Sequence, residues 1–544
     1  MPIGSYALED FLDLVKSFHG SVAPGILLGG FMVAALQKQL PSDRLYDALC
    51  ETSACLPDAV QLLTPCTTGN GWLKVIDLGR YAVTLYDKEN GHGLRAYVDT
   101  AKLAPYPALA EWYYKRKPKK AQDKKRLLAE LKAAGADVCS FQPVRIPQRF
   151  MGKASRGAMA PCPVCGEGYP VTHGAVCRGC QGEAPYVTPA EQDAAPFLPS
   201  PVVDTVALHQ AVGLPLLHDL TQIEPGRSKG PVFRRGQVID VGDICRLQRM
   251  GRRKLHVEER LPPASDWVHE DEAARAFADA MAGDGVVHDG VPREGKITFT
   301  AARDGLLVVD KPLLEAFNML EGVMCAARQN FSVVQAGRAL AATRAIPLYL
   351  PLSQYARAMA VLSGGPLFSV RAMRRARVGI LVTGTEVFEK RIVDGFAPVI
   401  RNKVERFDCR VVWQKIVPDD RAAIAEAAAE AGEAAVELLV TTAGLSVDPD
   451  DVTRLGLADA GAEAVRYGAP VLPGAMLFLA RIGAMQVIGV PACALYHKAT
   501  SFDLVLPRIL AGFDPDRRDL ARLAEGAFCL GCKTCTFPKC GFGK

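Results

Sequence analysis

The C-terminal third of the chain alternates short apolar runs with longer amphipathic stretches. The apolar runs predict buried strands at residues 378–382, 411–417, 438–441 and 486–490. The stretches between them predict helices at residues 394–407 and 421–431, the second capped by Asp419, and a closing helix at 495–510 that Pro507 interrupts. Strands that alternate with helices predict a doubly wound, mostly parallel sheet covered on both faces. Such sheets bind ligands at the carboxyl ends of their strands.

The rest of the chain divides at its cysteine clusters and at a linker rich in Pro, Ala and acidic residues, 188–201. An apolar stretch at 22–36 contains glycines and a proline and is too short to span a bilayer, so we expect a buried core segment there. The predicted fold class is therefore multidomain α/β and α+β. Its expected parts are residues 1–150, 151–190, 191–376, 377–512 and 513–544.

Composition and charge narrow the range of partners. The formal net charge of +5 comes from 64 basic and 59 acidic residues, a balance that does not favour nucleic acid as the main partner. A local basic run at 115–126 is interpreted as the solvated face of a helix, because leucines continue it at helical spacing. Acidic residues precede Lys16, which is the wrong charge order for a secretory signal. We therefore expect a cytoplasmic chain with no membrane partner.

Sixteen cysteines in a reducing compartment favour metal ligation over disulfides. Two CxxC pairs with eleven residues between them let four thiolates surround one ion tetrahedrally, as in closed structural zinc sites. Such a site would stabilise a segment too small to have a core of its own. The predicted zinc ligands are Cys162, Cys165, Cys177 and Cys180.

A second group of cysteines lies in the C-terminal tail, and its members are Cys529, Cys532, Cys535 and Cys540. The CxxCxxC spacing is typical of iron-sulfur ligation. The fourth cysteine, however, follows after four residues and has Pro538 ahead of it, whereas ferredoxins place it after three residues and before a proline. The tail is predicted to bind metal. A cubane iron-sulfur cluster, a second zinc ion and a thiol-rich arm that delivers metal all remain open.

Two turns follow predicted strands in the C-terminal region, one with Thr383, Gly384, Thr385 and Glu386 and the other with Thr442, Ala443, Gly444 and Ser446. Small residues let backbone N–H groups approach a ligand, hydroxyls add donors, and a following helix N-terminus favours negative charge. Both turns therefore suit a phosphate.

In order and spacing, the segment from about 377 to 511 resembles the molybdopterin-binding domain of the MoeA and MogA-type cofactor-biosynthesis proteins. The family's TGDEL is matched by residues 383–387, its DD by 419–420, its SGGVSVGxxD by 442–451, its PG turn by Pro473 and Gly474, and its LPGNP by 490–493. The resemblance implies a molybdopterin ligand at these turns and makes Asp451 the candidate catalytic carboxylate. Thr385 stands where metal-inserting members usually have Asp, so insertion chemistry is in doubt while binding is not.

The region ahead of this segment resembles the companion region of stand-alone molybdopterin-binding proteins. The residues that carry the resemblance lie at 217–221, 225–230, 269–273, 294–296 and 343–347. Lys229 and Arg344 could pair with a phosphate across a cleft, or serve in ordinary ion pairs.

The N-terminal residues 7–186 resemble the FmdE family, which is named for a protein encoded with formylmethanofuran dehydrogenase, a molybdenum or tungsten enzyme. The resemblance implies a metal site with His19, Cys55 and Cys66 as ligands, and imidazole with thiolate suits zinc. The family's FHGHxCPG has a His and a Cys where this chain has Ser21 and Ala23, so two of the family's ligands are missing.

These features predict a molybdopterin-binding protein that matures, stores or delivers the molybdenum or tungsten cofactor to a redox enzyme. Whether the chain itself inserts metal, as a metal transferase would, stays open, and homo-oligomers are expected by analogy alone. Two alternatives are a non-catalytic scaffold that senses metal or redox state and a hydrolase of a nucleotide-type ligand.

Overall fold

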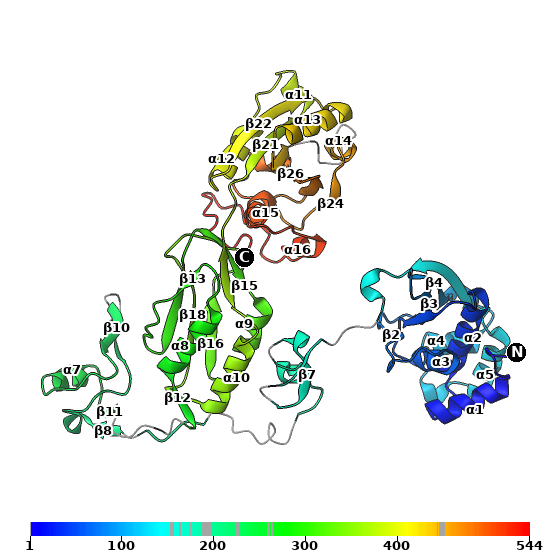
Figure 1. Ribbon diagram of the computed structural model, residues 1–544, viewed down its shortest axis with the longest axis horizontal. Helices are drawn as coiled ribbons and strands as arrows, with labels where there is room; N and C mark the ends of the chain where they lie inside the picture. Colours follow the sequence, from blue (N-terminus) through cyan, green and yellow to red (C-terminus); the bar gives the residue numbers. More distant parts are fainter. Residues whose placement is uncertain are drawn as a thin grey trace. The chain divides into compact units, whose positions relative to one another are not determined.

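The structure of the protein is a computed structural model. It describes residues 2–152, 157–162, 165–174, 176–187, 199–203, 205–224, 226, 228–257, 262, 265–442, 444 and 452–544. The chain forms two compact units, residues 1–157 and residues 158–544 (Figure 1).

The first unit is an α+β domain built on one five-stranded sheet of order β2-β1-β3-β4-β5. Its strands are β1 (Tyr46–Cys50), β2 (Leu73–Val75), β3 (Ala82–Asp87), β4 (His92–Val98) and β5 (Cys139–Arg145). Its helices are α1 (Leu8–His19), α2 (Pro24–Gln39), α3 (Leu56–Leu63), α4 (Pro107–Tyr113) and α5 (Lys124–Ala134). The apolar stretch at 22–36 becomes α2, whose middle is almost wholly buried, so the predicted core segment is confirmed.

The second unit begins with two small sub-structures. The hairpin of β6 (Met159–Pro161) and β7 (Gly168–Pro170) carries the first CxxC pair. Residues 205–257 then form a small cluster around Leu216, Phe233 and Leu247. Its elements are β8 (Thr205–Ala207), β9 (Leu220–Glu224), β10 (Ser228–Phe233), α7 (Asp243–Arg249) and β11 (Lys254–His256).

A companion domain follows, in which small antiparallel sheets pack on three helices around Phe277 and Phe299. The helices are α8 (Glu270–Met281), α9 (Lys311–Asn318) and α10 (Leu352–Leu362). The strands are β12 (Trp267–His269), β13 (Val286–Val287), β14 (Lys296–Ala301), β15 (Gly305–Val309), β16 (Val323–Ala327), β17 (Val333–Val334), β18 (Ala339–Ala345), β19 (Tyr349–Pro351) and β20 (Phe368–Arg371).

The C-terminal domain contains a six-stranded sheet of order β22-β21-β23-β26-β25-β24, in which the first four strands are parallel. Its strands are β21 (Arg377–Thr383), β22 (Arg410–Val417), β23 (Leu438–Thr442), β24 (Glu463–Tyr467), β25 (Phe478–Ile482) and β26 (Met485–Val490). Its helices are α11 (Thr385–Phe388), α12 (Phe396–Glu405), α13 (Arg421–Glu433), α14 (Thr453–Asp459), α15 (Ser501–Leu510) and α16 (Arg517–Ala521).

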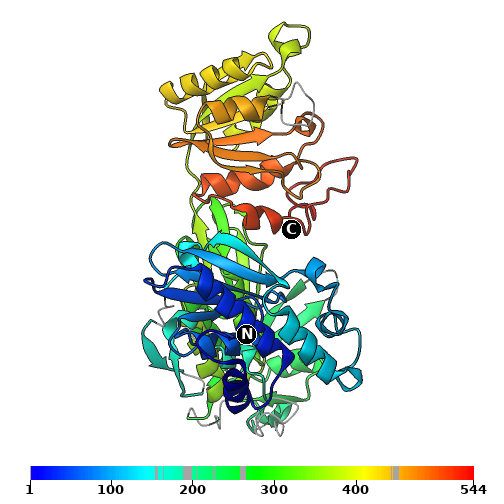
Figure 2. The same cartoon turned by 90° about the vertical axis from the view of Figure 1, so that its right-hand side faces the viewer.

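Helices cover both faces of this sheet, as the alternation of apolar runs and amphipathic stretches predicts. Ile380 packs with α12 and α15, whereas its neighbour Leu381 packs with α13, because successive side chains of a strand point to opposite faces. Figure 2 shows strands of the sheet between the golden helix α13 and the red-orange helix α15. The four predicted strands and the two predicted internal helices are all present, with ends shifted by a few residues.

Three expectations for this domain are wrong in detail. Asp420, not Asp419, caps α13, accepting a hydrogen bond from Ala423 N at 2.8 Å. The stretch at 495–510 is not one helix, because a 3-10 turn at Ala492–Leu495 is followed by a separate α15 with its own cap at Thr500. Pro507 lies inside α15 without ending it, and the antiparallel strands β24 and β25 did not stand out from the apolar pattern.

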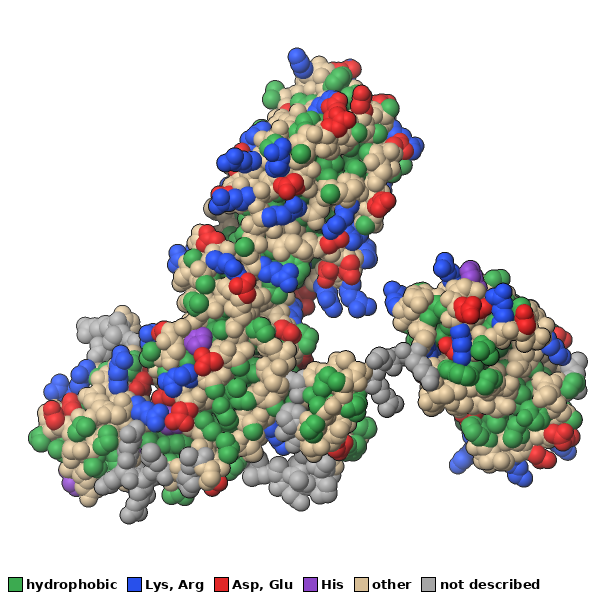
Figure 3. All heavy atoms as spheres, viewed as in Figure 1, with side chains coloured by type: hydrophobic (Ala, Val, Ile, Leu, Met, Phe, Trp, Pro, Cys, Tyr) green, Lys and Arg blue, Asp and Glu red, His purple; other side chains and the backbone are tan. Residues whose placement is uncertain are grey.

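The surface agrees with the balanced composition. On the face that Figure 3 shows, acidic side chains are interspersed among the Lys and Arg of the C-terminal domain. In the part of the chain that the structure describes, no helix has both the length and the apolar character needed to cross a bilayer.

Candidate functional site

Three parallel strands of the C-terminal sheet end at the same edge. Val382 pairs with Thr442 and Thr442 pairs with Val490, so the turns after β21, β23 and β26 are neighbours. We call this edge, with the turn at 383–386 and residues 442 and 444, the ligand edge. It is the position at which parallel sheets bind ligands.

Threonine side chains connect the turns of the ligand edge. The Thr383 hydroxyl donates to the carbonyl oxygen of Thr442 at 2.9 Å and lies 2.9 Å from the hydroxyl of Thr453 at the start of α14. All three residues are buried. The ends of β21 and β23 and the first turn of α14 are therefore held in a fixed relation before any ligand binds.

Two hydroxyls at the end of β23 have no partner. Thr441 Oγ1 and Thr442 Oγ1 are buried, and neither makes a hydrogen bond within the described structure. Buried polar groups are nearly always satisfied, so an unsatisfied pair needs an explanation. Hydroxyl donors beside a ligand-binding strand end fit the phosphate of a molybdopterin-type ligand.

Gly444 lets the chain pass very close to the start of α14. Its φ of +60° lies in the left-handed region, and a Cβ there would sit 2.0 Å from Thr453 Oγ1. Only glycine fits this position. The predicted ligand residues Ala443, Ser446 and Asp451 lie outside the described residues, so Gly444 and Thr442 define the turn.

Thr385 is tied to the loop after β22. Its backbone N–H donates to Asp419 Oδ2 at 2.8 Å, and its hydroxyl accepts from the backbone N–H of Asp419 at 3.1 Å. Asp419 therefore fixes the turn at 383–386 instead of capping α13. The following helix α11 is a single turn of four residues, so the helix dipole that the sequence suggested contributes little there.

Pro473 and Gly474 are held against α15. The Ser501 hydroxyl donates to the Gly474 carbonyl at 2.7 Å, and a Cβ on Gly474 would lie 2.3 Å from Ser501 Oγ. This close approach explains the need for glycine through packing, and a contact of this turn with a ligand stays a prediction.

Arg454 is a candidate binding residue that the sequence comparison missed. It lies in the first turn of α14, stacks over the Tyr467 ring at 4.3 Å, and its Nε is buried without a hydrogen-bond partner. A cation with unused donors next to Thr453 would complement a phosphate. Its position just after an acidic loop was the only signal in the sequence.

The four predicted zinc ligands come together. The sulfur atoms of Cys162, Cys165, Cys177 and Cys180 all lie within 4.8 Å of one another, and those of Cys165 and Cys177 are 3.7 Å apart. Zn–S bonds of about 2.3 Å in a tetrahedron place sulfurs about 3.8 Å apart. Backbone N–H groups of Cys177 and Cys180 donate to Cys162 and Cys177 sulfurs, each at 3.4 Å. This arrangement fits one tetrahedral zinc ion.

The predicted ligands of the first unit are not gathered in the same way. His19 Nδ1 lies 2.6 Å from Asp58 Oδ2, whereas the Cys66 thiol is buried and donates to the carbonyl oxygen of Tyr46 at 3.3 Å. Cys55 precedes α3, and burial followed by repulsion from Asp58 raises the pKa of its thiol. Among the described residues only the four zinc-finger cysteines form a group close enough to share one ion. Metal binding by His19, Cys55 and Cys66 therefore stays a prediction.

Motifs of the companion region converge in space. Asp219 accepts hydrogen bonds from Arg235 N at 2.9 Å and from Glu294 N at 3.3 Å. His269 Nε2 lies 3.3 Å from the carbonyl oxygen of Leu217. Segments at 217–219, 235, 269–271 and 294 thus form one polar junction between the 205–257 cluster and the companion domain.

Ionisable groups at this junction have displaced pKa values. Burial and then the charge of Asp271 raise the pKa of Glu270 to about 7, against the ion pair with Arg344 at 3.3 Å. Burial and then the neighbouring His256 lower the pKa of His218 to about 4. Arg344 serves in an ion pair here, which is one of the two roles that its sequence context allowed.

The fold and these sites define a multidomain metal- and cofactor-binding protein with a C-terminal α/β ligand-binding domain. Four families match its parts. They are "FmdE, Molybdenum formylmethanofuran dehydrogenase operon" at residues 18–146, "FmdE treble clef zinc finger" at 153–187, "Domain of unknown function (DUF8806)" at 205–259 and "Probable molybdopterin binding domain" at 379–511. The chain therefore joins an FmdE domain and its zinc finger to a domain of the molybdopterin-binding family.

Two curated relatives match short stretches of the chain. A "Probable S-adenosyl-L-methionine-binding protein" of Archaeoglobus fulgidus is 35% identical over 107 residues, which are 18% of this chain and 29% of that protein. A "CinA-like protein" of Amoebophilus asiaticus is 32% identical over 82 residues, which are 15% of this chain and 20% of that protein. The chain thus covers less than a third of the length of these relatives.

Solved structures resemble the two ends of the chain. An FmdE-like protein of Syntrophus aciditrophicus, related to tungsten formylmethanofuran dehydrogenase, is 44% identical, covering 34% of this chain and all of its own, with a TM-score of 0.32. The tungsten cofactor synthesizing protein MoaB of Pyrococcus furiosus is 17% identical, covering 25% of this chain and 93% of its own, with a TM-score of 0.19.

Proposed function

We propose that the protein binds a molybdopterin-type ligand at the ligand edge and serves the maturation, storage or delivery of the molybdenum or tungsten cofactor. The observation that carries the proposal is the pair of buried, unpartnered hydroxyls of Thr441 and Thr442 at the end of β23. The turn at 383–386, Gly444 and Arg454 would surround the phosphate with small residues and one cation.

The ligand would supply sulfur atoms that hold the metal. The chain would contribute orientation, because Thr383, Thr453 and Asp419 fix the turns before binding. Asp451 is the candidate for orienting a metal or water, and thiolates of the first unit or of the tail would present metal as soft ligands. The proposed client is a molybdenum or tungsten redox enzyme in the cytoplasm, and pairing of two copies of the chain is part of the proposal.

A second candidate is a non-catalytic sensor of cofactor status. It is favoured by Thr385, which offers a hydroxyl where insertion chemistry would want a carboxylate. That hydroxyl is already engaged by Asp419. Binding without insertion would then be the whole task of the domain.

The deciding experiment measures the affinity of the purified full-length protein for molybdopterin, with Thr442→Val as the test variant. Losing one hydrogen bond to a charged group should weaken binding about tenfold. The same change replaces an unsatisfied buried hydroxyl by a methyl group, so the free protein should keep or gain stability. Thr298→Val, at an exposed strand position of the companion domain, is the control. If the wild-type protein shows no measurable affinity, the proposal is wrong.

A further inference from the structure

The cysteine-rich tail is closed into a loop on the C-terminal domain. The Gly543 N–H donates to the carbonyl oxygen of Gly526 at 2.9 Å, which joins the two ends of the loop. Near its start, Cys529 N donates to the carbonyl oxygen of Leu472 at 2.8 Å, and Leu472 N donates back to Ala527 at 2.9 Å. All four tail cysteines lie within this closed loop, so their positions are restrained.

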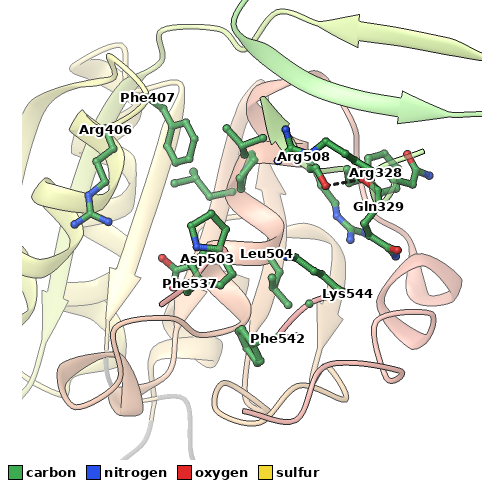
Figure 4. A pocket seen from close by; sticks show the side chains of 18 of the residues that line it. Arg328, Gln329, Arg406, Phe407, Asp503, Leu504, Arg508, Phe537, Phe542 and Lys544 are labelled. Atoms are coloured by element: carbon green, nitrogen blue, oxygen red, sulfur yellow. Dashed lines mark hydrogen bonds between the residues drawn. The ribbon is translucent and has the colours of Figure 1, made fainter. Parts of the chain in front are cut away.

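Aromatic side chains anchor the far end of the loop. The rings of Phe537 and Phe542 lie 6.0 Å apart and belong to the apolar cluster around α15, and a Cβ on Gly543 would lie 2.3 Å from Leu504. Figure 4 shows Phe537, Phe542 and Leu504 in one wall of a cavity of about 390 Å³. The tail is thus packed against the domain and is not a free arm.

The four tail cysteines line a second cavity of about 500 Å³. The opposite part of its wall is the loop at 496–499, which contributes Tyr496, His497 and Lys498. Two of the cysteines, Cys529 and Cys540, are half-buried, and the other two are exposed. The cavity is therefore rich in sulfur and open to solvent on one side.

The spacing of these sulfurs differs from that of the zinc finger. There, four sulfurs lie within 4.8 Å of one another, as one tetrahedral ion requires. In the tail, which the structure describes throughout, the cysteines face one cavity without forming such a group. A shared cavity with separated sulfurs suits a body larger than one ion, and CxxCxxC spacing is typical of iron-sulfur ligation.

We propose that the four tail cysteines hold an iron-sulfur cluster in this cavity. On binding, each thiol gives up its proton and its sulfur bonds to an iron atom. Four thiolates leave such a cluster with net negative charge, and Lys498 and Lys533, which line the cavity, complement it.

The cavity adjoins elements of the ligand edge. Its loop at 496–499 follows β26 and the 3-10 turn Ala492–Leu495, and Cys529 is hydrogen-bonded to the residue just ahead of Pro473. The cluster would therefore lie beside the molybdopterin-binding region. This placement rests on the proposed function, whereas cluster binding itself does not.

The test is anaerobic reconstitution of the full-length protein with iron and sulfide. The expected product contains about four irons and about four acid-labile sulfides per chain, the composition of a [4Fe–4S] group. It should also show the broad visible absorption of such a group and an electron paramagnetic resonance signal after reduction. Zinc content is measured in parallel and should remain about one ion per chain, held by the zinc finger.

The test variant is Cys532→Ser combined with Cys535→Ser, since both side chains are exposed and their loss leaves the core intact. It should lose most of the iron and sulfide while keeping zinc and the melting temperature. The matched control is Cys245→Ser, another exposed cysteine, which lies on α7 outside the tail. It should retain the full cluster.

Two outcomes would overturn the proposal. One is a tail that binds a single zinc ion and no sulfide, and the other is a double variant that keeps its iron. Molybdopterin affinity is measured on the same samples. Cluster binding without pterin affinity would sink the proposed function alone, and pterin affinity without a cluster would sink this inference alone.

Discussion

The backbone N–H of Thr385 donates to Asp419 Oδ2 at 2.8 Å, and the Asp419 N–H donates back to the Thr385 hydroxyl at 3.1 Å. This reciprocal pair joins the turn after β21 to the loop after β22. Since it does not depend on a ligand, it presents the turn at 383–386 in a fixed shape. A preformed turn binds an anion with a smaller entropic cost than a mobile one.

Asp419→Ala should loosen this turn. We expect the affinity for molybdopterin to fall about tenfold and the free energy of unfolding to fall by about 1 kcal/mol, the net contribution of such hydrogen bonds. Titration calorimetry and denaturant unfolding give the two values.

The neighbouring carboxylate provides a matched control. Asp420→Ala removes the N-cap of α13 and should also cost about 1 kcal/mol. Its side chain does not contact the turn at 383–386, so molybdopterin affinity should stay unchanged. Equal losses of affinity in both variants would mean that Asp419 acts only through general stability.

Thr385→Asp restores the carboxylate that the sequence lacks, and it places that carboxylate next to Asp419, since Thr385 Oγ1 lies 3.3 Å from Asp419 Oδ2. Like charges at this exposed site should cost up to about 1 kcal/mol at low ionic strength and less in high salt. Unfolding midpoints at two salt concentrations check this. A variant that is as stable as the wild type at low salt would show that the turn readily rearranges.

The C-terminal sheet was predictable because its signals are local. Buried parallel strands are continuous apolar runs, and Ile380 and Leu381 face different helices without any polar position between them. β24 and β25 were not found because their burial depends on neighbours, with Glu463 and Arg466 exposed or half-exposed at the sheet margin. The role of Asp419 was misassigned because a second acceptor at 420 was free to cap the helix.

The sites divide in the same way. Zinc ligands with CxxC spacing are separated by tight turns, so sequence distance fixes spatial distance, and all four cysteines meet. The junction of Asp219, His269 and Glu294 depends on the packing of two domains. Neither that junction nor the unsatisfied Nε of Arg454 is visible in the spacing of residues along the chain.

Removal of zinc should unfold the finger alone. Cys165→Ser should lower the zinc content by about one ion per chain, because the segment around 158–187 has little core without its metal. Hydrogen exchange should rise in that segment and stay unchanged in β21 and β23. The Cys245→Ser variant should keep its zinc. Retention of zinc by Cys165→Ser would contradict the four-cysteine site.

The polar junction should respond to pH in two opposing ways. The pKa of Glu270 is raised from 4.5 to about 7, so its contribution to stability is full below pH 4.5 and is lost as pH rises to 7. The pKa of His218 is lowered from 6.5 to about 4, and burial also lowers that of His269. The histidine contribution is full above pH 6.5 and is lost as pH falls to 4. In the wild type the two slopes largely cancel.

Glu270→Gln should remove one slope and expose the other. Stability of the junction should then rise with pH between about 4 and 6.5, by up to about 3 kcal/mol for a shift of this size. His218→Gln should do the reverse, with stability that falls as pH rises between 4.5 and 7. Trp267 of β12, next to His269, can report local urea unfolding in a background with Phe at the other three tryptophans. Identical pH profiles in the two variants would show that neither group titrates at the junction as its burial requires.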